Sequence, residues 1–209
     1  MNYLTKRILT SIMLFFIVCL SLSNSILLFL LLIILNLLAI SEFNLIFKNI
    51  FKHNKFLIFS SVFFSVFYLT LFSVIIWIHL LSLEYTQIIS LVLILTICVS
   101  SDIGGFVFGK LIGGKKLTKI SPNKTYSGVV GSFLFALLFG YLIFYFQRNF
   151  LLFNLDILLI IFIVSIISQI GDLIISFLKR KAKIKDTGVI LPGHGGILDR
   201  IDGILLGLP

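Results

Sequence analysis

Residues 151–178 read LLFNLDILLIIFIVSIISQIGDLIISFL, and apolar stretches of this kind decide the fold class. A helix that crosses a bilayer needs roughly 20 consecutive apolar residues, so this stretch is long enough to do so. Stretches of the same character precede it at 8–22, 25–45, 56–82, 87–112 and 125–147. We therefore predict an all-α integral membrane protein, a polytopic bundle of about six spanning helices, the first of them short.

The overall composition agrees with a membrane protein. Hydrophobic residues make up 59% of the chain and charged residues only 12%. The mean hydropathy of +1.19 lies outside the range of soluble domains. No internal repeat or disordered linker interrupts the chain. We expect a single membrane domain over residues 1–209, with N-terminal spans in 1–85 and a catalytic half in 86–209.

The basic residues predict the orientation of the chain. Cytoplasmic loops of membrane proteins carry an excess of Lys and Arg. With the N-terminus inside, six spans place 16 of the 17 basic residues on the cytoplasmic side and leave only Arg148 outside. The net charge of +9 then reflects topology and attraction to anionic lipid, and it does not indicate nucleic acid. We expect both termini in the cytoplasm and the protein in a bacterial inner membrane.

The segment 176–202 reads SFLKRKAKIKDTGVILPGHGGILDRID. It is rich in charged residues and glycine, whereas the chain around it is strongly apolar. Its glycine-bearing turns let the backbone approach a ligand closely and present N–H groups to anions. The run 199–202 supplies carboxylates, which Mg²⁺ prefers when it bridges phosphates. The mixture of cations and acids suits a substrate that carries phosphate together with its metal.

Asp172 is a second polar signal, because it sits inside an apolar run where a carboxylate costs roughly 2.5 to 3.5 kcal/mol at the bilayer centre. Something must compensate its charge. A helix would align it in one polar stripe that leads to the cytoplasmic surface, made of Ser165, Ser168, Gln169, Asp172, Ser176 and Lys179. Asp102 makes a similar intrusion and could line the same cavity. For both acids, an interhelical hydrogen bond or ion pair is the alternative.

The run Ser-Pro-Asn-Lys-Thr at 121–125 precedes a predicted helix. Its backbone N–H groups and Lys124 could bind an anion, or the run could simply cap the helix; the local pattern leaves both open. The loops 109–124 and 179–202 share the predicted cytoplasmic face, where we expect the active site.

Gly105, Gly109 and Gly113 recur at intervals of four. Small residues at this spacing let one membrane helix approach another closely, so we favour a packing role. Glycine-rich helix faces are also compatible with a homodimer.

The segment 176–202 resembles the signature of the phosphatidate cytidylyltransferase family, also called CDP-diacylglycerol synthases. The signature reads Ser-x-apolar-Lys-Arg, four residues, Lys-Asp-x-small, two residues, apolar-Pro/Gly-x-His-Gly-Gly-apolar-x-Asp-Arg-apolar-Asp, and every fixed position matches. The run at 121–125 resembles the family's Ser-Pro-x-Lys-Thr element. Two features depart from the family: Ser127 stands where it has an acidic residue, and the chain has fewer spans and ends at 204–209, too short to cross a bilayer.

The resemblance implies transfer of a cytidylyl group from CTP to phosphatidic acid within the membrane lipid, giving CDP-diacylglycerol and pyrophosphate. It implies Mg²⁺ as cofactor and leaves a second cation open. The residues expected to act on the reacting groups are Asp172, Asp199, Lys179, Arg180 and His194, and the expected metal ligands are Asp172, Asp199 and Asp202. The residues expected to bind substrate are Ser121, Lys124, Thr125, Ser176, Lys185, Asp186, Gly195, Gly196 and Arg200. His194 could instead only lock its loop.

Two other functions are compatible with parts of the sequence. A CTP-dependent transferase that acts on another lipid phosphate would need the same cationic, metal-binding face. An ion-coupled transporter could use Asp102 and Asp172 as ion sites. The transporter is disfavoured because no repeat pairs the two halves of the chain and it has no need of the His-Gly-Gly loop.

Overall fold

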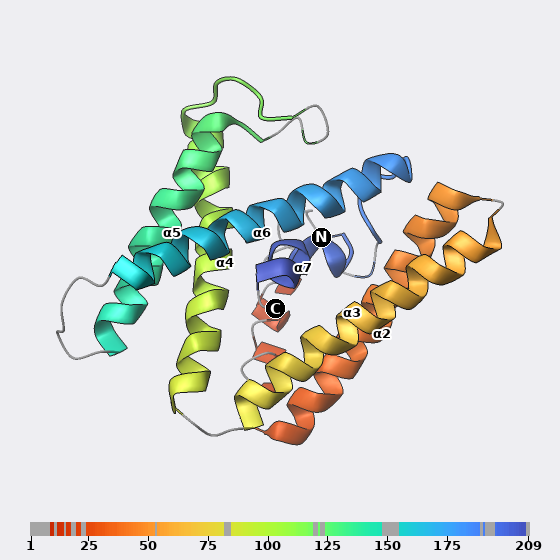
Figure 1. The fold of residues 1–209 in the computed structure, drawn as a ribbon, viewed down its shortest axis with the longest axis horizontal. Helices are drawn as coiled ribbons and strands as arrows, with labels where there is room; N and C mark the ends of the chain where they lie inside the picture. Colours follow the sequence, from red (N-terminus) through yellow and green to blue (C-terminus); the bar gives the residue numbers. More distant parts are fainter. Residues whose placement is uncertain are drawn as a thin grey trace. The chain divides into compact units, whose positions relative to one another are not determined.

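The structure, a computed structural model, is built of helices (Figure 1). It describes residues 24–52, 54–81, 85–118, 121, 124–147, 155–188, 190 and 195–207, and positions 9, 10, 12–14, 16, 17, 20 and 21. The helices are α2 (Ser25–Phe51), α3 (Lys55–Leu81), α4 (Tyr85–Leu111), α5 (Tyr126–Gln147), α6 (Leu155–Lys181) and α7 (Leu198–Gly207). Over the ranges just given there is no strand, only an isolated bridge between Lys116 and Thr125. The predicted all-α class is confirmed.

Five of these helices, α2 to α6, are long and apolar enough to cross a bilayer. Their apolar parts are Ile26–Phe51, Lys55–His79, Ile89–Leu111, Tyr126–Phe146 and Leu155–Lys181. They correspond to five of the six predicted spans. The other predicted span, 8–22, is described only at scattered positions, with gaps between them. It therefore stays a prediction. By the length and composition of its helices, the chain is an integral membrane protein.

The chain forms two compact units. Unit 1 comprises Met1–Ser82 and Leu178–Ile201, and unit 2 comprises Leu83–Phe177 and Asp202–Pro209. The signature segment 176–202 therefore belongs mainly to unit 1. The prediction of a single membrane domain stays a prediction.

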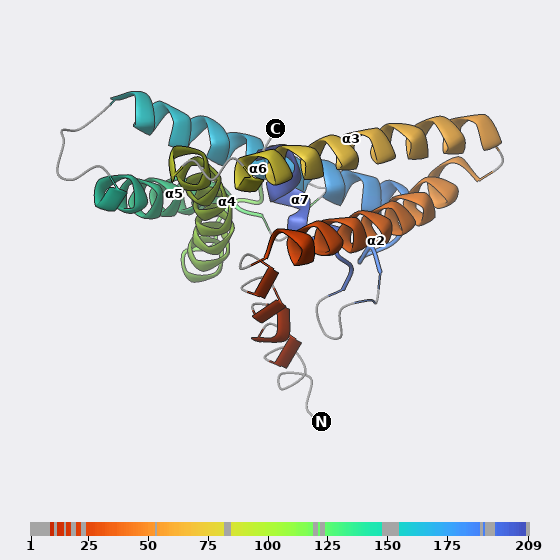
Figure 2. The same cartoon turned by 90° about the horizontal axis from the view of Figure 1, so that it is seen from below.

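In unit 1, α2 and α3 run antiparallel along each other, as Figures 1 and 2 both show. The Asn54 N–H donates to the carbonyl oxygen of Phe51 at the end of α2 (2.9 Å). The Asn54 side chain caps α3 by accepting the backbone N–H of Leu57 (3.2 Å). The rings of Phe29 and Trp77 meet edge to face with centroids 4.3 Å apart. Ser73 donates a hydrogen bond to the Asn36 side chain (3.1 Å). Aromatic packing and one interhelical polar contact thus hold this pair together.

In unit 2, α4 and α5 approach closely through facing glycines. A Cβ atom at Gly104 would collide with the carbonyl oxygen of Gly131, and one at Gly131 would lie 2.7 Å from the carbonyl oxygen of Gly104. Cβ atoms at Gly105 and Gly109 would also come within 4 Å of α5. The packing role predicted for these two glycines is confirmed. Gly113 has no atom within 4 Å of its Cβ position and instead adopts φ +64° in the turn after α4.

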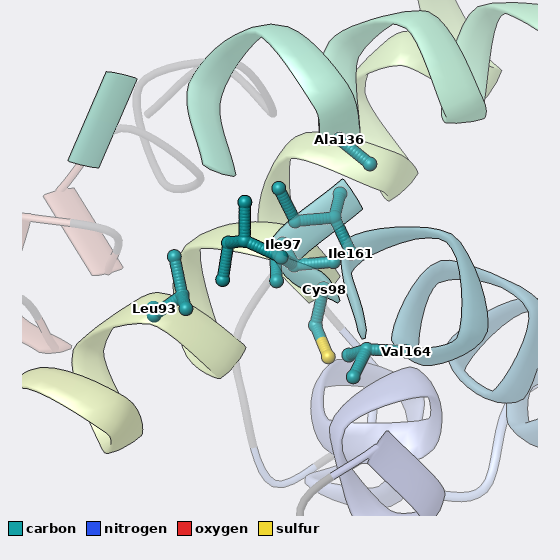
Figure 3. Close-up of a cluster of buried hydrophobic side chains, with 7 residues drawn as sticks. Leu93, Ile97, Cys98, Ala136, Ile161 and Val164 are labelled. Atoms are coloured by element: carbon teal, nitrogen blue, oxygen red, sulfur yellow. The ribbon is translucent and has the colours of Figure 1, made fainter. Parts of the chain in front are cut away.

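The buried core of unit 2 lies where α4, α5 and α6 meet (Figure 3). Ile97 and Cys98 of α4 and Ile161 of α6 are fully buried in it. The cluster consists of Leu93, Ile97, Cys98, Ala136, Ile157, Ile161 and Val164. Because lipid tails are as apolar as these side chains, the cluster stabilises the unit by van der Waals packing. Cys98 packs in this core as a small apolar side chain with a free thiol.

The polar stripe predicted along α6 is partly sealed inside unit 2. Ser165 and Ser168 are fully buried, and the hydroxyl groups of Ser165 and Ser101 are hydrogen-bonded at 3.0 Å. The end of the chain packs closely on this part of α6, since a Cβ atom at Gly203 would lie 2.7 Å from the Ser168 hydroxyl. Farther along α6 the stripe opens into a pocket.

Candidate active site

A pocket of about 280 Å³, lined by both charged and apolar side chains, lies in unit 2. Its walls come from α4, from the loop before α5, from the first turns of α5 and from α6. The lining residues are Asp102, Gly105, Phe106, Ser121, Lys124, Thr125, Gly128, Val129, Ser132, Gln169 and Asp172. Four predicted site residues, Ser121, Lys124, Thr125 and Asp172, therefore line one cavity.

The centre of this pocket is an ion pair between Lys124 and Asp172. The Lys124 Nζ atom lies 2.6 Å from Asp172 Oδ2, and both side chains are about three-quarters buried. Lys124 also reaches the carbonyl oxygen of Gln169 (3.5 Å), one turn back on α6. Ser176 donates to Asp172 Oδ1 (3.3 Å). The charge of Asp172 inside an apolar helix is thus compensated by a lysine from the neighbouring loop.

Asp102 lines the same pocket from α4. The sequence singled it out as an intramembrane acid, but it was not among the predicted site residues. Its side chain is exposed, while the neighbouring Ser101 is fully buried against Ser165. Two carboxylates and a lysine therefore share one cavity, which is a donor set suited to a cation together with an anionic ligand.

The loop before α5 holds Lys124 in place. The Lys124 N–H donates to the carbonyl oxygen of Ser121 (3.1 Å), and its carbonyl oxygen accepts from the N–H of Leu117 (2.8 Å). Thr125 caps α5, because its hydroxyl oxygen accepts the N–H of Gly128 (3.1 Å). The two interpretations of the run 121–125, anion binding and helix capping, are therefore compatible with each other. Thr125 caps the helix while Lys124 lines the pocket.

Ser127, at the position where the resemblance leads us to expect an acidic residue, makes hydrogen bonds within the protein. Its hydroxyl donates a short hydrogen bond to the carbonyl oxygen of Gly113 and lies 2.9 Å from the Thr125 hydroxyl. It thereby ties the start of α5 to the turn that follows α4.

Unit 1 contains the second cluster of predicted residues, centred on Asp199. The Lys179 Nζ atom lies 2.6 Å from Asp199 Oδ1, and these side chains are 13% and 9% exposed. Asp199 Oδ2 accepts hydrogen bonds from the backbone N–H groups of Thr187 (2.9 Å) and Gly196 (3.1 Å). Burial alone would raise the pKa of Asp199, but the hydrogen bonds from Lys179, Thr187 and Gly196 outweigh it and hold the pKa below its ordinary value.

The backbone geometry and close packing beside Asp199 explain why glycine occupies positions 195 and 196. Gly195 adopts φ +82°, a conformation that favours glycine, and a Cβ atom there would lie 2.9 Å from Asp199 Oδ2. A Cβ atom at Gly196 would collide with the hydroxyl of Thr187. The Gly196 N–H, predicted to help bind substrate, points at Asp199 in this structure.

Glu42 of α2 is a buried acid that the sequence analysis missed. It is 3% exposed, and its carboxylate accepts hydrogen bonds from the Thr187 hydroxyl (2.6 Å) and from the backbone N–H groups of Ile197 (2.8 Å) and Leu198 (2.9 Å). The signal was present, because Glu42 is the only acid in the apolar helix 25–51, and an intramembrane carboxylate indicates a functional site.

The other predicted site residues that the structure describes lie outside the two clusters around Asp172 and Asp199 or at their edges. Arg180, Lys185, Asp186 and Arg200 are exposed in unit 1. Asp202, in unit 2, accepts the backbone N–H of the next residue (3.0 Å). His194 lies outside the described residues, so its role stays a prediction.

The predicted metal ligands are divided between the units: Asp172 and Asp202 are in unit 2, and Asp199 is in unit 1. Among the described residues, no three His, Cys, Asp or Glu side chains gather as a metal-binding group. The prediction that Asp172 and Asp199 hold a shared cation stays a prediction.

Comparison with known proteins identifies the family. The model of the cytidylyltransferase family matches residues 2–209. The chain belongs to the cytidylyltransferase family. Membership in this family confirms the resemblance that the signature segment indicated.

Relatives named phosphatidate cytidylyltransferase occur in several bacteria. The chain is 45% identical over 113 residues to one from Staphylococcus haemolyticus, an alignment that covers 52% of this chain and 42% of the relative. It is 40% identical over 121 residues to one from Helicobacter pylori, covering 57% and 44%. It is 40% identical over 138 residues to one from Rickettsia bellii, covering 62% and 60%. The chain thus matches about half of the length of these relatives.

Proposed function

We propose that this member of the cytidylyltransferase family transfers a cytidylyl group from CTP to phosphatidic acid, forming CDP-diacylglycerol and releasing pyrophosphate. The observation that carries the proposal is the pocket of unit 2, which is lined by Lys124 of the loop before α5, Asp172 of α6 and Asp102 of α4. The names of the bacterial relatives support the choice of reaction.

The chemistry requires charge neutralisation more than a protein nucleophile. A phosphate oxygen of phosphatidic acid attacks the α-phosphorus of CTP, a new P–O bond forms, and the bond to the departing pyrophosphate breaks. Both reactants are polyanions, so cationic side chains must offset their repulsion and the charge that develops on the leaving group. Lys124 and Lys179, each already held by a carboxylate, are the lysines we assign to this role.

The donor set fits a hard divalent cation. Mg²⁺ is commonly bound through one or two carboxylates and substrate phosphates, and Asp172 and Asp102 supply two carboxylates in one pocket. We therefore assign Asp172 and Asp102 as Mg²⁺ ligands there, and we keep Asp199 and Asp202 as further candidates. When bound, Mg²⁺ would polarise the phosphoryl oxygens and stabilise the developing charge.

The exposed cations of unit 1 suit the binding of phosphate. We assign Arg180, Lys185 and Arg200 to the substrate phosphates, since a guanidinium can hold a phosphate through two parallel hydrogen bonds. Asp186 would orient Lys185. The Ser121 and Ser176 hydroxyl groups are further candidates for contacts with substrate oxygens.

We infer that the site opens to the cytoplasm of a bacterial inner membrane. The excess of basic residues in the predicted inner loops supports this orientation. A homodimer stays a prediction.

The proposal is tested by supplying labelled CTP, Mg²⁺ and phosphatidic acid to the purified protein in detergent. We expect release of pyrophosphate that depends on the lipid and formation of labelled CDP-diacylglycerol. A parallel reaction with a polyprenyl phosphate separates a transferase for another lipid phosphate from the proposed one. Solute or ion flux in liposomes without any turnover would contradict the proposal and favour a transporter.

A further inference from the structure

We infer that Glu42 is a positioning residue for the reaction: its carboxylate holds the loop and helix start that orient Asp199. The inference rests on the proposed function and deepens it, because it adds a residue from an N-terminal helix to the machinery of the signature segment. It is argued entirely from contacts within unit 1.

The carboxylate of Glu42 joins two separate parts of the signature segment. Oε2 accepts the Thr187 hydroxyl (2.6 Å) and the Leu198 N–H (2.9 Å), and Oε1 accepts the Ile197 N–H (2.8 Å). Leu198 is the first residue of α7, so the carboxylate also satisfies N–H groups at a helix start, where negative charge is favourable. Both oxygens of the Glu42 carboxylate, a side chain that is 3% exposed, therefore accept hydrogen bonds.

Both parts that Glu42 holds carry hydrogen-bond donors to Asp199. Thr187 donates its N–H to Asp199 Oδ2 (2.9 Å), and its hydroxyl oxygen lies 3.1 Å from the same atom. Gly196, next to Ile197, donates its N–H to Asp199 Oδ2 (3.1 Å). Movement of either part would therefore shift the Asp199 carboxylate away from its present contacts.

The Thr187 hydroxyl connects the two acids directly. It has a single proton but lies near both Glu42 Oε2 and Asp199 Oδ2. Because the contact with Glu42 is shorter by half an ångström, we take the Thr187 hydroxyl to donate its proton in the hydrogen bond to Glu42 Oε2. Asp199 Oδ2 then keeps only its two backbone donors, and Oδ1 receives Lys179. One lone pair on Asp199 Oδ1 is then left for a further ligand.

The glycines around the carboxylate show how closely the site is built. A Cβ atom at Gly196 would lie 2.6 Å from Glu42 Oε1, and one at Gly188 would lie 3.0 Å from the same oxygen. The space these glycines leave is occupied by the Glu42 carboxylate. Two glycines of the signature segment thus leave room for the carboxylate of an acid from α2. The sequence pattern within residues 176–202 does not specify this partner.

The test compares Glu42→Gln with wild type and with Ser41→Ala. Glutamine keeps the size of the side chain but puts an NH₂ group against the donors that Glu42 accepts. Ser41 is the exposed neighbour, and its hydroxyl donates to the Leu38 carbonyl oxygen of the same helix (2.7 Å). The control therefore changes α2 without touching the signature segment.

Two measurements are made on the full-length protein in detergent. Hydrogen exchange followed by mass spectrometry reports on peptides that cover residues 186–200, without substrates. Steady-state kinetics report kcat, the KM for CTP and the Mg²⁺ concentration that gives half-maximal rate. For Glu42→Gln we expect faster exchange in these peptides, kcat lower by about 10- to 100-fold and a raised Mg²⁺ requirement, as for loss of a residue that orients a ligand.

These readouts separate positioning from simple loss of folded protein. Partial unfolding would lower kcat but leave the KM and the Mg²⁺ requirement of the remaining active molecules unchanged. Glu42→Asp, which keeps the carboxylate, should recover part of the activity lost in Glu42→Gln. The inference would be overturned if residues 186–200 exchanged hydrogen in Glu42→Gln at the wild-type rate. It would also be overturned if the kcat of Glu42→Gln lay within twofold of that of an active wild type.

A second pair of variants covers the case in which Glu42→Gln does not fold. Thr187→Val removes the hydroxyl between the two acids, whereas Thr187→Ser keeps it. We expect the valine variant to lose activity about tenfold or more and the serine variant to stay close to wild type. Equal activities of the two variants would overturn the inference. Absence of lipid-dependent turnover in the wild type would contradict the proposed function alone, because hydrogen exchange still decides whether Glu42 holds the loop.

Discussion

Each unit holds one lysine against one aspartate. Lys124 pairs with Asp172 and Lys179 pairs with Asp199, in both cases at 2.6 Å. These pairs are partly or largely buried, so salt screens them less than it screens surface pairs. A lysine held in this way has its side chain already ordered before an anionic substrate arrives. The sequence predicted that the charge of Asp172 needs compensation, but Lys124 as its partner emerges only from the fold.

Asp172→Asn should lower the turnover of CTP strongly. The substitution leaves Lys124 without its ionic partner and removes one of the two carboxylates in the pocket, so we expect a loss of about 10- to 100-fold. Initial rates of lipid-dependent pyrophosphate release measure the effect. Asp156→Asn is the matched control, because Asp156 is an exposed acid in the first turn of the same helix. Wild-type turnover in Asp172→Asn would remove this residue from the site.

At the scale of elements, the approach of α4 to α5 sets one wall of the pocket. Facing glycines bring the two helices together on the side where Asp102 and Lys124 line the cavity. The spacing of Gly105 and Gly109 predicted close packing, since it places both on one helix face. The contact of Gly104 with Gly131 could not be predicted, because a spacing within one helix does not identify the partner helix.

Gly131→Ala should destabilise unit 2. The added Cβ would lie 2.7 Å from the Gly104 carbonyl oxygen and would also overlap Phe108. Overpacking of this kind costs about 1–3 kcal/mol, which exceeds the gain of up to about 1 kcal/mol from replacing glycine by alanine in a helix. Val130→Ala, at an exposed neighbour, is the control. Thermal unfolding in detergent measures both variants, and an unchanged midpoint for Gly131→Ala would contradict the close contact.

At the scale of the whole molecule, the distribution of basic residues predicts one orientation. Of the 17 Lys and Arg residues, 16 fall on the predicted cytoplasmic side. A reversed orientation would put nearly all of these charges on the outer side, against the general bias of membrane proteins.

Single cysteines test this orientation. In a protein whose two native cysteines are replaced by alanine, we expect Arg148→Cys to react with a membrane-impermeant maleimide added to intact cells. Lys183→Cys should react only after the membrane is permeabilised. The two positions control for each other, and the opposite labelling pattern would show that the termini lie outside.

The sequence by itself determined the membrane-spanning character, the all-α class, the polar stripe of α6 and the family signature. Each of these depends on composition, periodicity or spacing within a short stretch of chain. The tertiary structure alone decided that Lys124 compensates Asp172, that Asp102 faces the same pocket and that Glu42 holds Thr187, 145 positions away. The physical reason is that a buried carboxylate must be satisfied by whichever donors the fold brings within hydrogen-bond distance, and local sequence does not specify those donors.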